Sequence, residues 1–213
     1  RRSFRDNALY AAVFNKYLSL NLSKGVPIEY FIEGGRSRTG RLLPPRPGML
    51  SMTISSYLVR PRRPIVFVPV YFGYERLMEG KSYISELSGQ AKQRETLLGL
   101  FKSLKVLRKR FGRVYVNFGD PIPLVDLLDA HSPDWREHDI RREDRPPWLQ
   151  GMVKDLGSRI LRGINEAAAI NPVNLVATAL LSTPRCRMLE TDLVQFLDLH
   201  LGLLRVAPYS ERV

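Results

Sequence analysis

The chain has 213 residues, of which 33 are Lys or Arg and 21 are Asp or Glu, so its formal net charge is +12. A hydrophobic fraction of 44% excludes an intrinsically disordered chain, because disorder requires a sequence too polar to bury a core. A single cysteine, Cys186, excludes an internal disulfide framework and favours a reducing compartment. No apolar run approaches the roughly 20 residues that a transmembrane helix needs.

The positive charge is concentrated near the start of the chain. Residues 1–63 contain 12 Lys and Arg against 3 Asp and Glu, a net charge of +9, whereas residues 64–213 carry a net charge of +3. Such asymmetry predicts an anionic partner, which could be nucleic acid, a membrane surface or a phosphorylated substrate. The sequence begins at Arg1 without a methionine, so we expect it to be a piece of a longer protein.

Helical and strand patterns alternate over the first part of the chain. An apolar stripe predicts a helix over roughly the first 20 residues, capped by Asp6 and ended by Gly25; its members are Leu9, Val13, Tyr17 and Leu20. Residues 28–32 have the composition of a short strand, which runs into a glycine-rich loop. Residues 49–59 form a second helical pattern.

Residues 65–72 are apolar throughout, which predicts a strand buried on both faces within an α/β sheet. A helical repeat over 97–111 and a strand over 113–118 follow. Residues 129–147 are rich in charge and proline and predict a linker. We therefore predict an α/β fold with a mixed sheet flanked by helices over 1–128, followed by a small helical C-terminal extension over 148–213.

Three helical patterns make up the predicted extension. They cover residues 148–169, 172–182 and 190–206, and Asn171 is the expected cap of the second of them, with Pro172 at its first position. No cluster of Cys and His residues or Asp-rich loop predicts a metal site.

The most informative stretch is Phe31–Gly40, with the sequence FIEGGRSRTG. It delivers a carboxylate, two arginines, two hydroxyls and several glycines into one loop at the end of a predicted strand. Glycine lets backbone amides approach a ligand, arginine matches phosphate oxygens with two parallel hydrogen bonds, and ligands of open α/β sheets bind at such strand ends. The loop suits a phosphate monoester, although composition alone equally allows an exposed, solvated basic turn.

The segment Phe31–Gly40 resembles the third conserved block of the bacterial membrane glycerol-3-phosphate acyltransferases. Residues 1–7 resemble the end of that family's second block, and residues 65–75 resemble its fourth, an apolar strand broken by Pro69. The blocks keep the family's order and approximate spacing. The tail, with NPVNLVA at 171–177 and LSTPR at 181–185, resembles the region after the family's catalytic domain, so the resemblance covers nearly the whole chain.

This resemblance implies an α/β acyltransferase fold and the transfer of a fatty acyl group from acyl-CoA or acyl-ACP, the acyl carrier protein thioester. The acceptor would be the sn-1 hydroxyl of glycerol 3-phosphate, and the product lysophosphatidic acid, a phospholipid precursor. The resemblance further implies no bound cofactor and a membrane surface as partner, at the cytoplasmic face of the bacterial inner membrane. Motif by motif, it assigns substrate binding to Arg2, Glu33, Gly34, Arg36, Ser37 and Arg38, with Arg1, Gly35 and Pro69 as weaker candidates.

The family's chemistry needs a His-x4-Asp pair, in which a neutral imidazole takes the proton of the attacking hydroxyl. None of the three histidines has Asp at the fifth following position; they are His131, His138 and His200. We therefore expect structural or solvated histidines and no acyltransferase activity from this chain alone. Two explanations stay open here: a part of a longer enzyme, or a natural remnant that binds without catalysing.

Two further uses of the positive charge remain open in the sequence. The basic helix over 91–111 could bind anionic lipid headgroups or acyl carrier protein, or it could be the solvated face of a helix packed on the core. A nucleic-acid-binding module is compatible with the net charge. However, no nucleic-acid motif and no interleaving of aromatic and basic residues is present, so we expect no nucleic-acid partner.

Overall fold

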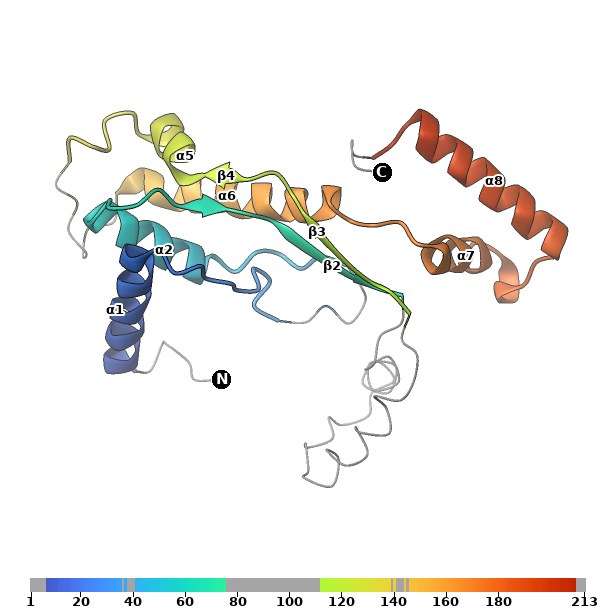
Figure 1. The fold of residues 1–213 in the computed structure, drawn as a ribbon, viewed down its shortest axis with the longest axis horizontal. Helices are drawn as coiled ribbons and strands as arrows, with labels where there is room; N and C mark the ends of the chain where they lie inside the picture. The colour runs from blue at the N-terminus through green and yellow to red at the C-terminus, as the bar shows by residue number, and fades with distance from the viewer. Residues whose placement is uncertain are drawn as a thin grey trace, which may run out of the picture. The chain divides into compact units, whose positions relative to one another are not determined.

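The computed structural model describes most of the chain in two compact units. Unit 1 comprises residues 1–69 and 120–163, and unit 2 comprises residues 70–119 and 164–213. Helices and small antiparallel ladders make up the described part (Figure 1), in agreement with the predicted α/β class and its C-terminal helices. The described residues are 7–35, 37, 41–75, 112–138, 140, 144 and 146–209. The predicted Asp6 cap and the predicted helix over 97–111 lie outside them.

The first helix, α1 (Ala8–Lys24), confirms the predicted helix at the start of the chain. The Asn7 side chain caps it by accepting a hydrogen bond from the Tyr10 amide at 2.8 Å. The helix ends at Gly25, as predicted, where φ is 74°. Glycine adopts this left-handed conformation at the least steric cost, which explains the stop.

The apolar stripe that predicted α1 does not face a core among the described residues. Its side chains are exposed; they are Leu9, Val13, Tyr17 and Leu20. The buried residue of this helix is Leu18, and α1 packs against α2 (Pro47–Val59), as Figure 1 shows. Helical spacing identified the helix correctly but not the face that it buries within the described chain.

Residues 28–32 form no strand, which corrects the second prediction. A strand needs a partner for its backbone N–H and C=O groups, and no described strand pairs with this segment. The Ile32 carbonyl instead accepts a hydrogen bond from the Arg46 amide at 2.7 Å. The loop that leaves at Ile32 therefore returns to the same point, directly before α2.

The apolar run over 65–72 is two short strands rather than one strand buried on both faces. In unit 1, β1 (Val66–Phe67) pairs antiparallel with β4 (Ile122–Pro123). In unit 2, β2 (Val70–Tyr74) pairs antiparallel with β3 (Val114–Phe118), which confirms the predicted strand over 113–118. The break falls at Pro69, because proline has no N–H to give to a ladder.

The β2–β3 ribbon also exposes one of its faces. Phe72 and Val116 are cross-strand partners and are 44% and 45% exposed. Side chains alternate between the two faces of a ribbon, and these two strands have no third strand or described layer over this face. An all-apolar sequence therefore does not mean burial on both faces here.

The core of unit 1 is built by three helices, α2, α5 (Leu124–His131) and α6 (Pro147–Glu166). Buried residues of α6 recur at the three- and four-residue spacing of an amphipathic helix. The predicted linker that begins at residue 129 starts inside α5, which was not predicted. The fully buried aliphatic and Met side chains of this core are Leu50, Ile54, Leu124, Leu127, Leu128, Met152 and Leu156.

The C-terminal helices of unit 2 agree with the predicted pattern. They are α7 (Pro172–Leu181) and α8 (Glu190–Val206), which pack against each other (Figure 1), with the short 3₁₀ helix η1 (Pro184–Cys186) between them in the chain. Asn171 caps α7, as predicted, by accepting a hydrogen bond from the Asn174 amide at 2.9 Å. Among the described residues, no helix combines the length and apolarity that a bilayer crossing requires.

Candidate functional site

The predicted phosphate loop starts with a tight turn. Ile32 is buried, whereas Phe31 before it is 76% exposed. The Gly34 amide donates a hydrogen bond to the Phe31 carbonyl at 2.9 Å, with a Gly34 φ of 61°. A side chain at this position would strain the backbone, so the first glycine of the motif has a structural reason independent of any ligand.

Glu33 closes the loop. One oxygen of its carboxylate, Oε2, accepts a hydrogen bond from the Leu43 amide at 2.9 Å, in a half-buried setting. The other oxygen, Oε1, has no hydrogen-bond partner within the described residues. The carboxylate therefore braces the two legs of the loop and still offers an acceptor, which suits the orientation of a hydroxyl group.

The returning leg of the loop rests on α6 in unit 1. Gly157 of α6 is buried, and a methyl group added there would lie 3.1 Å from Cγ of Pro45 and 3.7 Å from Leu50. The absence of a side chain at Gly157 thus lets the proline ring sit directly on the helix. An isolated glycine inside a helical pattern is the sequence signal for such a close approach.

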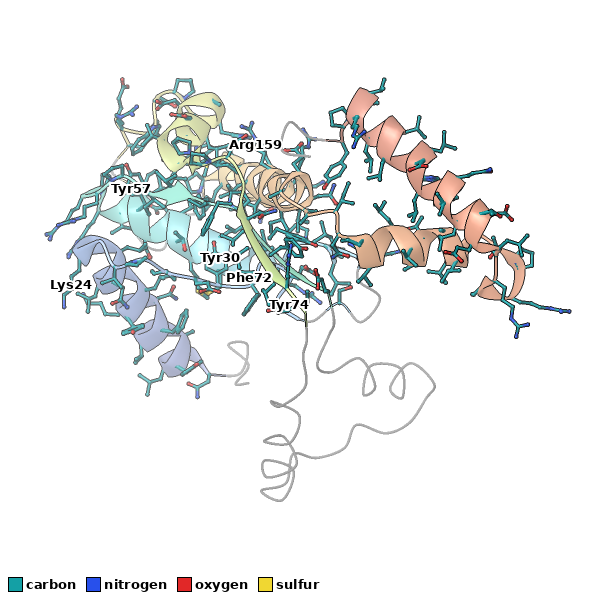
Figure 2. The ribbon with its side chains drawn as sticks, turned by 45° about the vertical axis from the view of Figure 1, so that its right-hand side comes forward. Lys24, Tyr30, Tyr57, Phe72, Tyr74 and Arg159 are labelled. Carbon is teal, nitrogen blue, oxygen red and sulfur yellow. The ribbon has the colours of Figure 1, made fainter. Side chains whose placement is uncertain are left out.

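Two buried hydroxyl groups belong to the residue before the loop's first turn and to α2. The Tyr30 and Thr53 hydroxyl oxygens are both buried, and neither makes a hydrogen bond of ordinary geometry in the described structure. Burial raises the pKa of Tyr30 well above its usual value, and the nearby Thr53 hydroxyl offsets that rise only in part. Figure 2 labels Tyr30 beside α2, the helix that carries Thr53.

The structure places part of the predicted site in one loop. Glu33 and Gly34 form its first turn, Gly35 is exposed with open space around its Cα, and Ser37 is half-buried. Of the other predicted phosphate ligands, the four arginines lie outside the described residues; they are Arg1, Arg2, Arg36 and Arg38.

Pro69 lies elsewhere in unit 1, between β1 and β2. Its side chain is fully buried, and a methyl group at Gly163 of α6 would come within 2.8 Å of its Cγ atom. This contact packs the break between β1 and β2 against α6. Sequence reasoning missed both glycine–proline contacts of α6, although the isolated glycines gave the signal.

His131 has a carboxylate partner that residue spacing did not reveal. His131 Nε2 lies 3.3 Å from Oδ2 of Asp155, and Arg159 lies 2.9 Å from the same oxygen. Burial raises the pKa of Asp155, but the hydrogen bonds from Arg159 and His131 outweigh it, so the pKa is lowered overall. His131 therefore ends α5 beside a partly exposed carboxylate rather than in a linker.

The other two histidines lie close to backbone oxygens, and His138 Nε2 also lies 3.7 Å from Oδ2 of Asp134. His138 Nδ1 lies 2.9 Å from the Asp134 carbonyl, and His200 Nδ1 lies 2.9 Å from the Phe196 carbonyl, with the Phe196 ring stacked at 3.7 Å. Neither has an Asp at the spacing of the family's catalytic pair. No described group of three or more Cys, His, Asp or Glu residues is placed to hold a metal ion.

Two family models match the chain. The model described as glycerol-3-phosphate acyltransferase C-terminal region matches residues 83–213, and the model described as acyltransferase matches residues 2–73. The second match contains the Phe31–Gly40 loop, and both α6 and the C-terminal helices fall in the first.

Curated relatives match almost the whole chain. Glycerol-3-phosphate acyltransferases of Pseudomonas putida strain GB-1 and Pseudomonas aeruginosa strain LESB58 are each 56% identical over 210 residues, which is 99% of this chain and 25% of each relative. That of Pseudomonas entomophila strain L48 is 55% identical over the same length. The chain thus spans about a quarter of the length of these relatives, and it belongs to the glycerol-3-phosphate acyltransferase C-terminal region family.

Proposed function

We propose that this chain is the substrate-binding part of a glycerol-3-phosphate 1-O-acyltransferase. The observation that carries the proposal is the 56% identity over 210 residues to proteins named as glycerol-3-phosphate acyltransferases. The braced loop that begins at Glu33 adds a physical reason, since its sequence concentrates arginines and hydroxyls suited to a phosphate monoester.

The proposed reaction is an acyl transfer. The sn-1 hydroxyl oxygen of glycerol 3-phosphate attacks the thioester carbonyl of acyl-CoA or acyl-ACP, a C–O ester bond forms, and the C–S bond breaks. The hydroxyl proton passes through a general base to the departing thiolate. The products are lysophosphatidic acid and the free thiol of coenzyme A or acyl carrier protein, and the product enters phospholipid biosynthesis.

The chain's own residues supply binding in this scheme. Arg36 and Arg38 hold the phosphate, together with Arg2 of the second block, while Ser37 and the backbone amide of Gly35 add neutral donors and Gly34 shapes the turn that carries them. Glu33 braces the loop through Leu43 and presents its second oxygen to a substrate hydroxyl. Arg1 and Pro69 are the weaker members, and Pro69 acts through its packing on Gly163.

The general base is not among these residues. None of the histidines fits His-x4-Asp, and the observed His131–Asp155 pair also engages Arg159. We therefore propose that the 213-residue chain binds glycerol 3-phosphate but transfers no acyl group by itself. Formation of lysophosphatidic acid by the purified chain would contradict this part of the proposal.

A thermal-unfolding titration tests the binding site. Glycerol 3-phosphate is expected to raise the melting temperature of the chain in a saturable manner, since a ligand that binds the folded state stabilises it. Arg36→Ala is expected to abolish the shift in melting temperature. Arg162→Ala, on the exposed surface of α6, also removes one positive charge but is expected to leave the shift unchanged. An equal loss in both variants would mean that only net charge matters.

Duplex DNA is expected to give no comparable shift in melting temperature, and stabilisation by DNA alone would favour a nucleic-acid-binding module.

The acyl donor and the membrane contact need a protein of the relatives' full length. Such a protein is expected to accept acyl-CoA or acyl-ACP and to fractionate with the cytoplasmic face of the inner membrane as a peripheral or membrane-associated protein. Because the product carries an acyl chain, release into a membrane avoids exposing that chain to water. Parallel assays with the two donors, and extraction from membranes at high salt, test these two points.

A further inference from the structure

A basic pocket lies in unit 1, at the C-terminal ends of α1 and α2. It has a volume of about 90 Å³, several times the roughly 10–15 Å³ that one water molecule requires, so a phosphate group fits. Its cationic lining residues are Lys16, Arg60, Arg62 and Arg63. Lys24 and Tyr57, both labelled in Figure 2, belong to the last turns of the two helices at this end of the unit.

The positive charge of this pocket has no acidic partner within the part of the chain that the structure describes. No acidic residue lines it, and none of its four cations forms an ion pair with a described residue. The ends of two helices contribute about half a negative charge each, or about one charge in total. An excess of about three positive charges therefore remains in one concave site, far more than is needed to complement the helix dipoles.

One of these cations lies against the end of α1. The Arg63 guanidinium lies directly over Gly25, where an added methyl group would come within 2.7 Å of its Nη1 atom. Gly25 is the left-handed residue that ends α1. The glycine therefore ends the helix and also leaves room for the arginine beside the pocket.

Neutral donors complete the lining. Ser19 of α1 and Ser56 of α2 both line the pocket, and their hydroxyl groups make no hydrogen bond to another described residue. Arginine forks and serine hydroxyls are the donor set that phosphate oxygens favour. An acidic peptide would need a longer groove, whereas this pocket admits a single compact anionic group.

The pocket is separate from the Glu33 loop. The Glu33 loop returns to α2 directly before the first residue of that helix, Pro47. There the Arg46 amide donates a hydrogen bond to the Ile32 carbonyl. The pocket is lined by Ser56 and Tyr57 near the other end of this helix, about 14 Å along the helix from Pro47 at 1.5 Å per residue. One glycerol 3-phosphate molecule is too short to span from the pocket to the described base of the Glu33 loop.

We propose that this pocket is a second phosphate-binding site, which takes the phosphate group of an anionic ligand other than the acyl acceptor. The shared chemistry is a phosphate mono- or diester, supplied either by a lipid headgroup or by a soluble molecule. Leu20, which lines the pocket and is 47% exposed, allows the apolar part of a lipid to follow its headgroup.

Titration of the purified chain with inorganic phosphate tests the site in an Arg36→Ala background, which removes the contribution of the Glu33 loop. A saturable rise in melting temperature is expected at constant ionic strength. The variant Arg60→Gln/Arg62→Gln is expected to weaken this binding at least about tenfold. Arg162→Gln/Arg187→Gln removes the same two charges from exposed positions outside the pocket and is expected to retain full affinity.

Vesicles distinguish the two sources of phosphate. Cosedimentation with phosphatidylcholine vesicles that contain phosphatidylglycerol, lost in Arg60→Gln/Arg62→Gln but not in the control, assigns the site to a lipid headgroup. Binding of inorganic phosphate without vesicle binding assigns it to a soluble ligand. No saturable phosphate binding, or an equal loss in both double variants, overturns the proposal. Because glycerol 3-phosphate binding depends on Arg36 instead, its loss or retention reports on the proposed function separately.

Discussion

Glu33 and Leu43 are joined by a hydrogen bond across ten residues of loop, from the Leu43 amide to the Glu33 Oε2 atom at 2.9 Å. The Glu33 carboxylate thus stabilises the closed loop even without a bound substrate. A loop that is already closed loses less conformational freedom when it binds a ligand. The glutamate of this motif therefore contributes to affinity through the shape of the loop as well as through direct contact.

Replacing Glu33 separates these two contributions. Glu33→Ala is expected to weaken glycerol 3-phosphate binding about tenfold or more and to reduce the free energy of unfolding by about 1–2 kcal/mol, since a half-buried charged hydrogen bond is lost. Glu33→Gln keeps an acceptor for the Leu43 amide and is expected to retain most of the stability. Calorimetric titration and urea unfolding measure the two effects. Equal stability of the two variants would show that the Leu43 bond does not brace the loop.

The Asp155 carboxylate, held by His131 and Arg159, makes stability depend on pH. Its pKa is lowered from the ordinary value of 3.8, so its contribution is present above that value and is lost as the pH falls through the lower pKa of the folded state. Because the side chain is 34% exposed, solvent screening limits the contribution to about 1 kcal/mol or less.

Urea unfolding of Asp155→Asn at several pH values tests this. The variant is expected to be less stable than the parent chain at neutral pH, and the difference is expected to shrink below about pH 4. Asp198→Asn, an exposed carboxylate on α8, is the matched control and is expected to show little difference at any pH. A constant deficit of Asp155→Asn across the whole range would argue against the ion pair.

Trp135 is expected to be the most sensitive position in the segment that sequence reasoning assigned to a linker. It is 5% exposed, lies 5.9 Å from the ring centre of Tyr57, and donates from Nε1 to Asp129 at 2.8 Å. Trp135→Ala is expected to cost about 3–5 kcal/mol. Trp135→Phe, which keeps the ring packing, is expected to cost about 1 kcal/mol. Chemical unfolding monitored by circular dichroism measures both, with the half-buried Trp148→Phe as the control.

Two glycines of α6 predict opposite effects of the same substitution. Gly163→Ala would place a methyl group 2.8 Å from the Pro69 ring, whereas at Gly151 no atom lies within 4 Å. Alanine favours a helix over glycine by about 1 kcal/mol, and overpacking costs about 1–3 kcal/mol. Gly151→Ala is therefore expected to stabilise the chain and Gly163→Ala to destabilise it. Stabilisation by both substitutions, measured as melting temperatures, would mean that Pro69 does not pack on α6.

Local patterns predicted most of the helices but not their partners. The caps at Gly25 and Asn171 follow from short-range backbone chemistry, so they could be read from neighbouring residues. The strand predicted over 28–32 is absent, because a strand depends on a partner elsewhere in the chain, which a local pattern does not reveal. The apolar run over 65–72 correctly indicated strand structure, but which faces of these strands are buried depends on the layers around them.

The candidate site was predictable in composition and not in geometry. Residue types placed Glu33, the glycines and the arginines in one phosphate loop, and that prediction of site residues is still to be tested by the substitutions above. The bond from Leu43 to Glu33 and the pairing of His131 with Asp155 join residues 10 and 24 positions apart. Such contacts follow from the path of the backbone, which spacing rules for single elements do not contain.

The packing of Pro45 on Gly157 has a consequence for whether the two matched regions of this protein can fold separately. The loop and α2 belong to the region matched by the acyltransferase model, residues 2–73, whereas α5 and α6 belong to the region matched by the C-terminal model, residues 83–213. The two regions nevertheless share one core in unit 1. They are therefore not independent modules, and removing the C-terminal region would remove α6, the helix on which the phosphate loop packs.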